Sequence, residues 1–292
     1  PLGNDIGAEI IGLDLRKPLS AAVFEEVEAA LFKYAVIAIR KQDIDTTQLS
    51  DFGRRFGPLQ ISGRRHSKNK DSEKRIQPDS LEVNYISNVK VDGKNLGSDD
   101  AGRYWHSDLC YETRTSKATI LHAIEVPVKD GVVYGATQFT DVAAAYDALP
   151  GDVKIRLAGL MAANSFRLMW NRKARQFGNR PLLSEEELSK FPPDAIHPVV
   201  RSHPVTKRKC LYVCEGYTDH ILDMPEQESR DLLEFLFVHV IKDEFRYQHE
   251  WQQGDVLIWD NCAVQHKATF DYAPPLRRLM QRCTVQEIAG TH

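Results

Sequence analysis

His106 and Asp108 stand two residues apart in the stretch WHSD, residues 105–108, and a further histidine, His266, follows far downstream. Alternate side chains of an extended strand point to the same face, so His106 and Asp108 can reach one metal ion together. Two imidazoles and one carboxylate fill three coordination positions and leave the others open, a ligand set typical of non-haem Fe(II) oxygenases. A lone His-x-Asp pair is weak evidence, so this interpretation depends on the rest of the chain.

Two arginines after His266 supply a second chemical feature. The motif RRLMQR, residues 277–282, places Arg278 and Arg282 on the same face if it forms a strand. Arginines that face the interior of a sheet fold are costly unless anions accompany them. The planar guanidinium binds a carboxylate through two parallel hydrogen bonds. The sequence therefore predicts a buried cofactor or substrate that carries a carboxylate.

The elements that position these residues are mainly short strands, with helices at the edges. Alternation and apolar runs predict strands at residues 8–15, 36–39, 82–88, 118–126, 132–139, 254–261 and 279–285, and a hairpin from 197–203 to 210–215. Helical spacing predicts helices at residues 20–34, 46–57, 140–149, 151–159 and 225–242. This pattern favours a β sandwich or jelly roll with flanking helices, formed by one domain over residues 1–292.

Two polar stretches interrupt the pattern, at residues 61–81 and 167–193. We expect both to be irregular surface loops that could serve as lids, because long loops in compact domains are usually functional or disordered. The proposed metal ligands at residues 106–108 follow a third polar loop, at the point where loop becomes strand. Chemistry on a rigid frame is commonly placed there.

Composition limits the class of protein. A net charge of -3 gives no electrostatic reason to expect a nucleic acid or membrane partner. The five cysteines form no Cys-x-x-Cys pair, which favours a reducing cytoplasm and argues against a structural zinc site. No apolar run reaches the length of a membrane span, and the first residues lack the pattern of a signal peptide. We therefore expect a cytoplasmic protein that acts on soluble small molecules.

Taken together, the motifs WHSD, WDNCAVQH and RRLMQR resemble those of the taurine dioxygenase family of Fe(II)/2-oxoglutarate-dependent oxygenases, which includes aryloxyalkanoate dioxygenases. The likeness extends through GAEIIGLDL, FGRRFGPL, AAYDAL, HPVVRSHP and LYVCEGYT, and so through nearly the whole chain. It implies a double-stranded β-helix (jelly roll) fold. It also implies a reaction in which 2-oxoglutarate and O2 give succinate and CO2 while a substrate C–H bond is oxidised.

The resemblance assigns roles to individual residues. It implies that His106, Asp108 and His266 bind iron, and that Arg278 holds the distal carboxylate of 2-oxoglutarate. Arg282 occupies a position that meets the substrate's acid group or the inner carboxylate of the cofactor. The family's Gly-Gly-Asp-Thr-x-Phe is represented by YGATQF, which makes Thr137 the candidate for a hydrogen bond to 2-oxoglutarate. Because related halogenases lack the carboxylate ligand, Asp108 favours hydroxylation, although desaturation and ring closure use the same ligands.

The substrate is less well defined by the sequence. The asparagine found in taurine dioxygenase is replaced here within Gly102-Arg103-Tyr104, so taurine itself is not expected. An aromatic pocket for a larger organic acid could be formed by Tyr85, Tyr104, Trp170 and Tyr217, with core packing as the alternative for each. The rival functions are a metal-dependent hydrolase or isomerase that uses zinc, and a non-catalytic scaffold. The resemblance also implies a homodimer or homotetramer.

Overall fold

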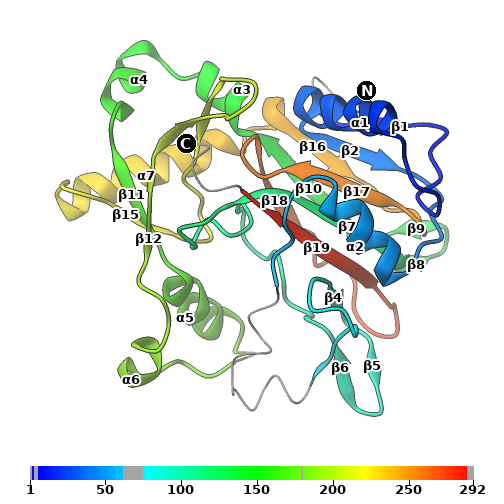
Figure 1. Ribbon diagram of the computed structural model, residues 1–292. Helices are drawn as coiled ribbons and strands as arrows, with labels where there is room; N and C mark the ends of the chain where they lie inside the picture. Colours follow the sequence, from blue (N-terminus) through cyan, green and yellow to red (C-terminus); the bar gives the residue numbers. More distant parts are fainter. Residues whose placement is uncertain (1, 3–5, 62–74, 179, 288–292) are drawn as a thin grey trace.

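The computed structural model describes residues 2, 6–61, 75–178 and 180–287, with a six-stranded sheet at its centre (Figure 1). The strands run in the order β1 (Ala8–Ile10), β2 (Val36–Ile39), β17 (Val256–Asp260), β7 (Ser116–Glu125), β19 (Leu279–Gln286) and β4 (Asn84–Ser87). Every neighbouring pair is antiparallel except β1 and β2. The predicted strand at residues 8–15 ends early because Gly12 adopts a φ of 87°.

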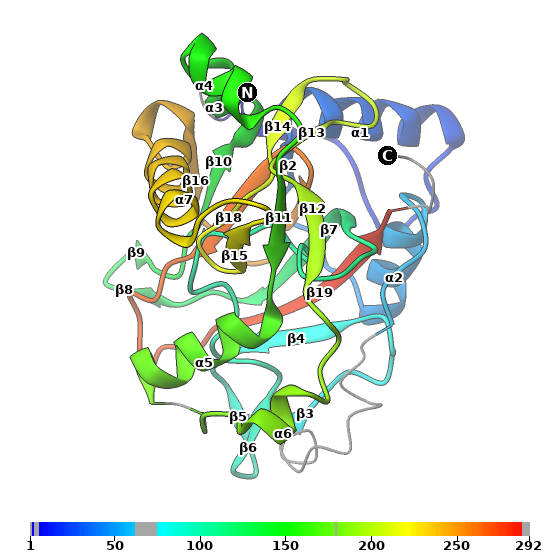
Figure 2. The same cartoon turned by 90° about the vertical axis from the view of Figure 1, so that its left-hand side faces the viewer.

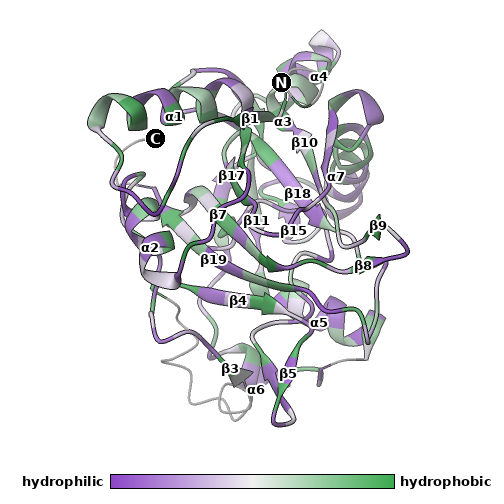
Figure 3. Cartoon of the chain, turned by 90° about the vertical axis from the view of Figure 1, so that its right-hand side faces the viewer, coloured by the Kyte–Doolittle hydropathy of each residue, from purple (hydrophilic) through white to green (hydrophobic). Residues whose placement is uncertain are grey.

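A second sheet has three strands, β16 (Arg246–His249), β10 (Thr137–Asp141) and β18 (Val264–Ala268). The two sheets share one apolar core. The large sheet contributes Leu121, Ala123, Leu257, Trp259 and Met280 to it, and the smaller sheet contributes Phe139, Tyr247 and Val264. The central strands are coloured largely hydrophobic in Figure 3, as expected for strands buried on both faces.

Helices α1 (Ala21–Tyr34) and α2 (Thr46–Arg54) pack against the other face of the large sheet (Figure 1). Both helices were predicted, and both begin at a residue whose side chain caps the helix. The Ser20 hydroxyl accepts a hydrogen bond from the Val23 amide, and Asp45 with Gln48 forms a capping box at the start of α2. A second apolar core therefore lies between these helices and the sheet.

A third core surrounds helix α7 (Glu226–Val240), which carries the predicted stripe of buried leucines. Three short helices lie around it: α3 (Val142–Asp147), α4 (Gly151–Leu157) and the 3-10 helix η2 (Asp243–Phe245). So does the hairpin formed by β13 (Val200–Ser202) and β14 (Lys209–Leu211). A three-stranded sheet of β12 (Ala195–Pro198), β11 (Met161–Asn164) and β15 (Thr218–Ile221) completes this layer. Figure 2 shows this layer beside the strands of the smaller sheet. The helices predicted at residues 140–149 and 151–159 are thus confirmed in slightly shorter form.

Short hairpins complete the fold. A turn at Asp92-Gly93 joins β5 (Lys90–Val91) to β6 (Lys94–Leu96), which pairs with β3 (Arg75–Ile76). The strand predicted at residues 132–139 was wrong as one element. It divides into β9 (Val132–Val133), which returns on β8 (Val128–Lys129), and the separate β10, because Gly135 interrupts it with a φ of 72°.

The irregular segment predicted at residues 167–193 was wrong in large part. It contains helices α5 (Phe166–Phe177) and α6 (Glu185–Leu188). Helix α5 begins at the Ser165 cap, whose hydroxyl accepts from the Leu168 amide, and ends at Gly178 with a φ of 59°. Most of the predicted loop at residues 61–81 lies outside the described residues. No helix in the described part of the chain is both long enough and apolar enough to cross a bilayer.

Candidate metal centre and cofactor pocket

The side chains of His106, Asp108 and His266 converge on one point in the protein interior. One donor atom from each lies within 4.8 Å of the others, and all three residues are buried. The His106 Nε2 atom is 3.6 Å from one Asp108 oxygen, and the His266 Nε2 atom is 3.8 Å from the other. Two imidazoles and a carboxylate at this spacing fit a divalent transition metal that retains open coordination positions.

The backbone brings the two histidines together across the chain. His106 and His266 exchange both of their backbone hydrogen bonds, at 3.1 and 2.8 Å, as an isolated antiparallel bridge. His266 itself lies in β18 beside Phe139 of β10. The expectation that residues 106–108 form a regular strand was wrong, because only His106 is paired and Asp108 begins a turn. The turn still directs the Asp108 carboxylate back toward both imidazoles.

Hydrogen bonds fix the orientation of the ligands. The His106 Nδ1–H donates to the Tyr104 carbonyl at 2.8 Å, which leaves the Nε2 lone pair for a metal. The Thr119 hydroxyl donates to Asp108 at 2.7 Å and accepts from the Asn261 side-chain amide at 2.9 Å. The Asn261 oxygen accepts from the Asp108 backbone amide at 3.2 Å. Asp108 is therefore held from two sides before any metal binds.

The charge states also suit a metal. Burial would raise the pKa of Asp108, but the nearby His266, Arg282 and His106 outweigh it and hold that pKa below its usual range. Burial, together with the adjacent His106, lowers the pKa of His266 to about 3. At neutral pH the carboxylate is ionised and the His266 imidazole is neutral, which are the forms that coordinate metal ions.

We expect the Thr119→Val substitution to lower Fe(II) affinity about 10- to 100-fold, the usual cost of removing an outer hydrogen-bond partner of a metal ligand. Valine keeps the shape of threonine but cannot donate to Asp108. Anaerobic titration of the apoprotein with Fe(II) against a chelator measures the effect. Thr140→Val is the matched control, because its buried hydroxyl donates to the Val240 carbonyl instead. Equal Fe(II) affinity in wild type and Thr119→Val would show that this hydrogen bond does not position the ligand.

Arg278 provides a buried positive charge close to Gly135 and Trp251. Its side chain is 4% exposed, its Nε atom has no hydrogen-bond partner, and no carboxylate in the described residues forms an ion pair with it. Burial lowers the pKa of Arg278, and the neighbouring Tyr272 and Asp271 act in the opposite direction. A guanidinium left in this state is costly unless an anion accompanies it. The arrangement thus fits a ligand carboxylate.

The walls around Arg278 are shaped for such a ligand. A Cβ atom added to Gly135 would lie 3.0 Å from the Tyr272 ring and 3.1 Å from Arg278 Cδ, so glycine is needed there. Thr137 accepts a hydrogen bond from the Trp251 indole at 3.1 Å, and the Trp251 ring lies 6.0 Å from the Arg278 guanidinium. The Thr137 hydroxyl keeps its own hydrogen for a further acceptor. Thr137 and Arg278 therefore both lie beside Trp251.

Arg282 lies on the same side of β19 as the metal ligands. Its Nη1 atom is 3.5 Å from an Asp108 oxygen. Its neighbour Gln281 points to the opposite face, where it hydrogen-bonds to His122. The predicted alternation of this strand is confirmed by these contacts. Arg282 thus stabilises the ionised carboxylate of Asp108 directly.

The four aromatic residues predicted to line a pocket lie in different parts of the structure. Tyr217 lies with its ring 5.9 Å from His106, and the Tyr104 carbonyl orients His106. Trp170 packs with Phe166 and Phe191, rings of the α5 and α6 region. Tyr85 pairs with Gln281 across β4 and β19, so its side chain shares the face opposite to Arg282. Only Tyr104 and Tyr217 are brought to the metal ligands.

Several residues of the site were not predicted from the sequence: Asn88, Thr119, Gly135, Trp251, Asn261 and Tyr272. Two of them belong to motifs that had been noticed for other reasons. Asn261 ends the WDN of WDNCAVQH, and Gly135 lies in YGATQF. Asn88 holds the Arg278 backbone, since its side-chain oxygen accepts from the Arg278 amide at 2.9 Å. These contacts depend on strand pairing, which motif spacing does not specify.

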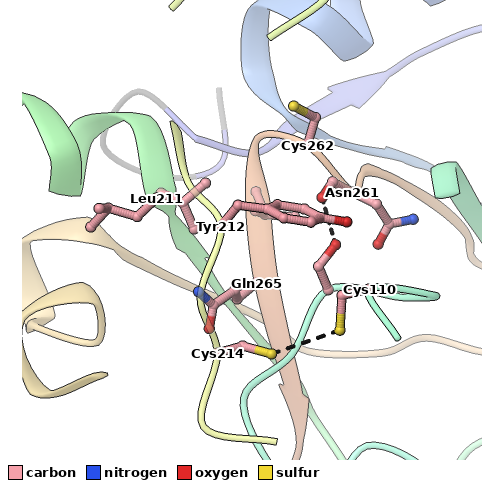
Figure 4. Close-up of a pocket in the computed structure, with 10 residues that line it drawn as sticks. Cys110, Leu211, Tyr212, Cys214, Asn261, Cys262 and Gln265 are labelled. Atoms are coloured by element: carbon pink, nitrogen blue, oxygen red, sulfur yellow. Dashed lines mark hydrogen bonds between the residues drawn. The ribbon is translucent and has the colours of Figure 1, made fainter. Parts of the chain in front are cut away.

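A small cavity lies behind the metal ligands, and Figure 4 shows the side chains that line it, including Cys110, Tyr212, Cys214 and Gln265. Its volume of about 10 Å³ is close to the minimum for a single water molecule. The Tyr212 hydroxyl and the Gln265 side-chain oxygen are both buried without a hydrogen-bond partner. The cavity is therefore too small for an organic substrate. All five cysteines are free and buried.

Comparison with known proteins is consistent with this geometry. Residues 1–284 match the family described as "Taurine catabolism dioxygenase TauD, TfdA family". The alpha-ketoglutarate-dependent 2,4-dichlorophenoxyacetate dioxygenase of Cupriavidus pinatubonensis is 31% identical over 99% of this chain and 97% of its own. Pentalenolactone F synthase of Streptomyces arenae is 29% identical, over 96% of this chain and 92% of its own.

A solved structure extends the similarity to the fold. The crystal structure of AAD-2 in complex with Mn(II) and N-oxalylglycine is 32% identical in sequence, with a TM-score of 0.81. The alignment covers 100% of this chain and 98% of that chain. The β-rich architecture with flanking helices is thus common to both proteins.

Proposed function

Since the chain belongs to the taurine catabolism dioxygenase TauD, TfdA family, we propose that His106, Asp108 and His266 hold its iron ion and that Arg278 holds its 2-oxoglutarate. The protein is a 2-oxoglutarate-dependent dioxygenase, and its reaction class is oxidation of a small organic molecule. When bound, iron and 2-oxoglutarate supply that oxidation: O2 and 2-oxoglutarate are consumed, succinate and CO2 leave, and a substrate C–H bond becomes C–OH.

The observation that carries the assignment is the buried guanidinium of Arg278, which lies near Gly135 and Trp251 and has no carboxylate partner in the described chain. In this proposal its two outer nitrogens donate to the distal carboxylate of 2-oxoglutarate, and the Thr137 hydroxyl donates to the same group. Arg282 keeps Asp108 ionised and supports the cofactor's inner carboxylate. The chain's own part is to bind and orient the reactants.

The substrate in this proposal is a small organic acid, hydroxylated at an unactivated C–H bond. Two similar proteins support that class: one is named for 2,4-dichlorophenoxyacetate, and another for sulfonates. Desaturation or ring closure is the alternative, because these reactions use the same three metal ligands. Tyr104 and Tyr217 are the aromatic candidates for the substrate side of the site.

The fold proposed for this site is a double-stranded β-helix, or jelly roll, in a single domain. The shared core of the two sheets supports it, as does the TM-score with AAD-2.

The segment at residues 167–193 is proposed as a cover over the site, since Gln176 of α5 accepts a hydrogen bond from Tyr104. The free cysteines favour a reducing cytoplasm. A homodimer or homotetramer is proposed as well, and α7 exposes Phe235 and Val238 for such contacts.

A screen for succinate release tests this function. Purified protein is supplied with Fe(II), 2-oxoglutarate and O2, and carboxylic and sulfonic acids are added one at a time. An acid that raises succinate release and is itself hydroxylated in equal amount supports the proposal. Product formed without O2 or 2-oxoglutarate would contradict it and favour a zinc-dependent hydrolase.

A further inference from the structure

Arg103 has an unusual environment three residues before the first metal ligand. Its guanidinium carbon lies 4.4 Å from the ring centre of Phe177 and 4.0 Å from that of Phe270. Phe177 ends helix α5, and Phe270 follows the strand that carries His266. Two aromatic faces thus hold the guanidinium between them, which fixes its plane by cation–π attraction. Only the edge of the group, with its N–H donors, remains available.

That edge has no partner within the described chain. Arg103 donates no hydrogen bond and forms no ion pair there, and its Nε atom is buried without an acceptor. An arginine carries five N–H donors, so this one is unsatisfied by the protein. Nearby cations differ: Arg172 pairs with Glu215 at 2.8 Å, and both Arg180 and Lys173 contact Asp100. Arg103 is therefore a cation beside α5 whose charge is balanced by no carboxylate of the described residues.

The position of Arg103 joins it to the active site. A Cβ added to Gly102 would lie 3.9 Å from the His106 ring and 3.3 Å from Ala268, two residues after His266. Burial raises the pKa of Tyr272, and the charges of Arg278 and Arg103 both oppose that rise. Tyr272 is thus near both arginines. Arg103 therefore lies close to the loop before His106, to the segment after His266, and to Tyr272.

We propose that Arg103 binds the acid group of the substrate, an inference that rests on the proposed function. Arg278 is assigned to 2-oxoglutarate, and Arg282 already lies 3.5 Å from Asp108. A second organic anion needs a cation of its own, and Arg103 is preoriented by Phe177 and Phe270 to offer one. The ligand in this proposal is a partly apolar molecule that ends in a carboxylate or a sulfonate. The rings of Phe177 and Phe270 would lie beside the carbon atoms next to that acid group.

The test measures binding without turnover. Protein loaded with Fe(II) and 2-oxoglutarate under anaerobic conditions is titrated calorimetrically with phenoxyacetate, hexanoate and hexanesulfonate, and with the neutral phenoxyacetamide. We expect at least one anion to bind wild type, with the carboxylate and sulfonate arms showing which acid group is preferred. Arg103→Gln should weaken that binding roughly 10- to 100-fold, the size that hydrogen bonds to a charged partner supply. It should leave phenoxyacetamide and 2-oxoglutarate affinities within about twofold of wild type.

Two further variants separate recognition from packing. Arg172→Gln is the matched control, because this neighbouring arginine also lies over an aromatic ring but is paired with Glu215. Arg103→Lys keeps the charge and should retain part of the anion affinity. The inference is overturned if Arg103→Gln binds the acids as wild type does, even with a lowered melting temperature, or if no acid binds wild type. If the wild-type protein still binds 2-oxoglutarate when the inference about Arg103 fails, the proposed function stands. If the wild-type protein does not bind 2-oxoglutarate, the proposed function and the inference about Arg103 are both wrong.

Discussion

Replacing Asp108 by alanine is expected to abolish oxidation of the substrate coupled to succinate release. The substitution removes one of the three metal ligands and leaves Arg282, 3.5 Å away, without its carboxylate. It also leaves the Thr119 hydroxyl without its acceptor. Loss of an outer partner alone costs about 10- to 100-fold in metal affinity or activity, so loss of the ligand itself should exceed roughly 100-fold.

The measurement compares succinate and oxidised substrate in wild type and variant at saturating Fe(II) and 2-oxoglutarate. Asp108→Asn is a useful second variant, because it keeps the size of the side chain and an acceptor for Thr119 while removing the charge. Asp147→Ala is the control, since this exposed carboxylate pairs with Arg208. Coupled turnover at the wild-type rate in Asp108→Ala would remove this residue from the metal site.

The second large effect is expected from Arg278→Ala. The variant should require roughly 30- to 4,000-fold more 2-oxoglutarate, because truncating one member of a buried, hydrogen-bonded charge pair costs about 2–5 kcal/mol. Iron affinity should change little, since Arg278 is not one of the three side chains that converge to form the metal site. One remaining bond from Thr137 is worth only about 0.5–1.5 kcal/mol and cannot replace the lost charge.

Arg277→Ala provides the matched control for this experiment. Arg277 is the preceding residue in the chain, but it is exposed and pairs with Glu125 at 2.6 Å. Its loss should leave the 2-oxoglutarate requirement unchanged. If Arg278→Ala and Arg277→Ala gave the same dependence on 2-oxoglutarate, the buried guanidinium would not be the cofactor's anchor.

How far the sequence predicted the site depended on whether a contact was local. His106 and Asp108 are near neighbours in the chain, and alternation along β19 turns Arg282 to the opposite face from Gln281, so motif spacing placed these residues correctly. Thr119 and Asn261 could not be found in this way. Their hydrogen bond exists because β7 pairs with β17, with Thr119 opposite Trp259. Long-range pairing of this kind is not visible in local patterns.

Local sequence patterns also predicted some elements of the fold and not others. Helices with an apolar stripe, such as α1 and α7, were predicted at nearly their observed bounds. Helix α5 was not, because its polar sequence conceals its periodicity, and its Ser165 and Gly178 caps were overlooked. Tyr85 was expected near the substrate, but its register opposite Gln281 turns it to the other face of the sheet. A shift of one residue in that pairing would reverse the result.

Anaerobic visible absorption on adding Fe(II) and 2-oxoglutarate to the apoprotein tests the central claim most directly. The claim is that one ion held by His106, Asp108 and His266 also receives 2-oxoglutarate held by Arg278. We predict a weak metal-to-ligand charge-transfer band in wild type that His266→Ala loses. In Arg278→Ala the band should need far more 2-oxoglutarate to form. Iron bound to wild type without any such band at saturating 2-oxoglutarate would contradict the account.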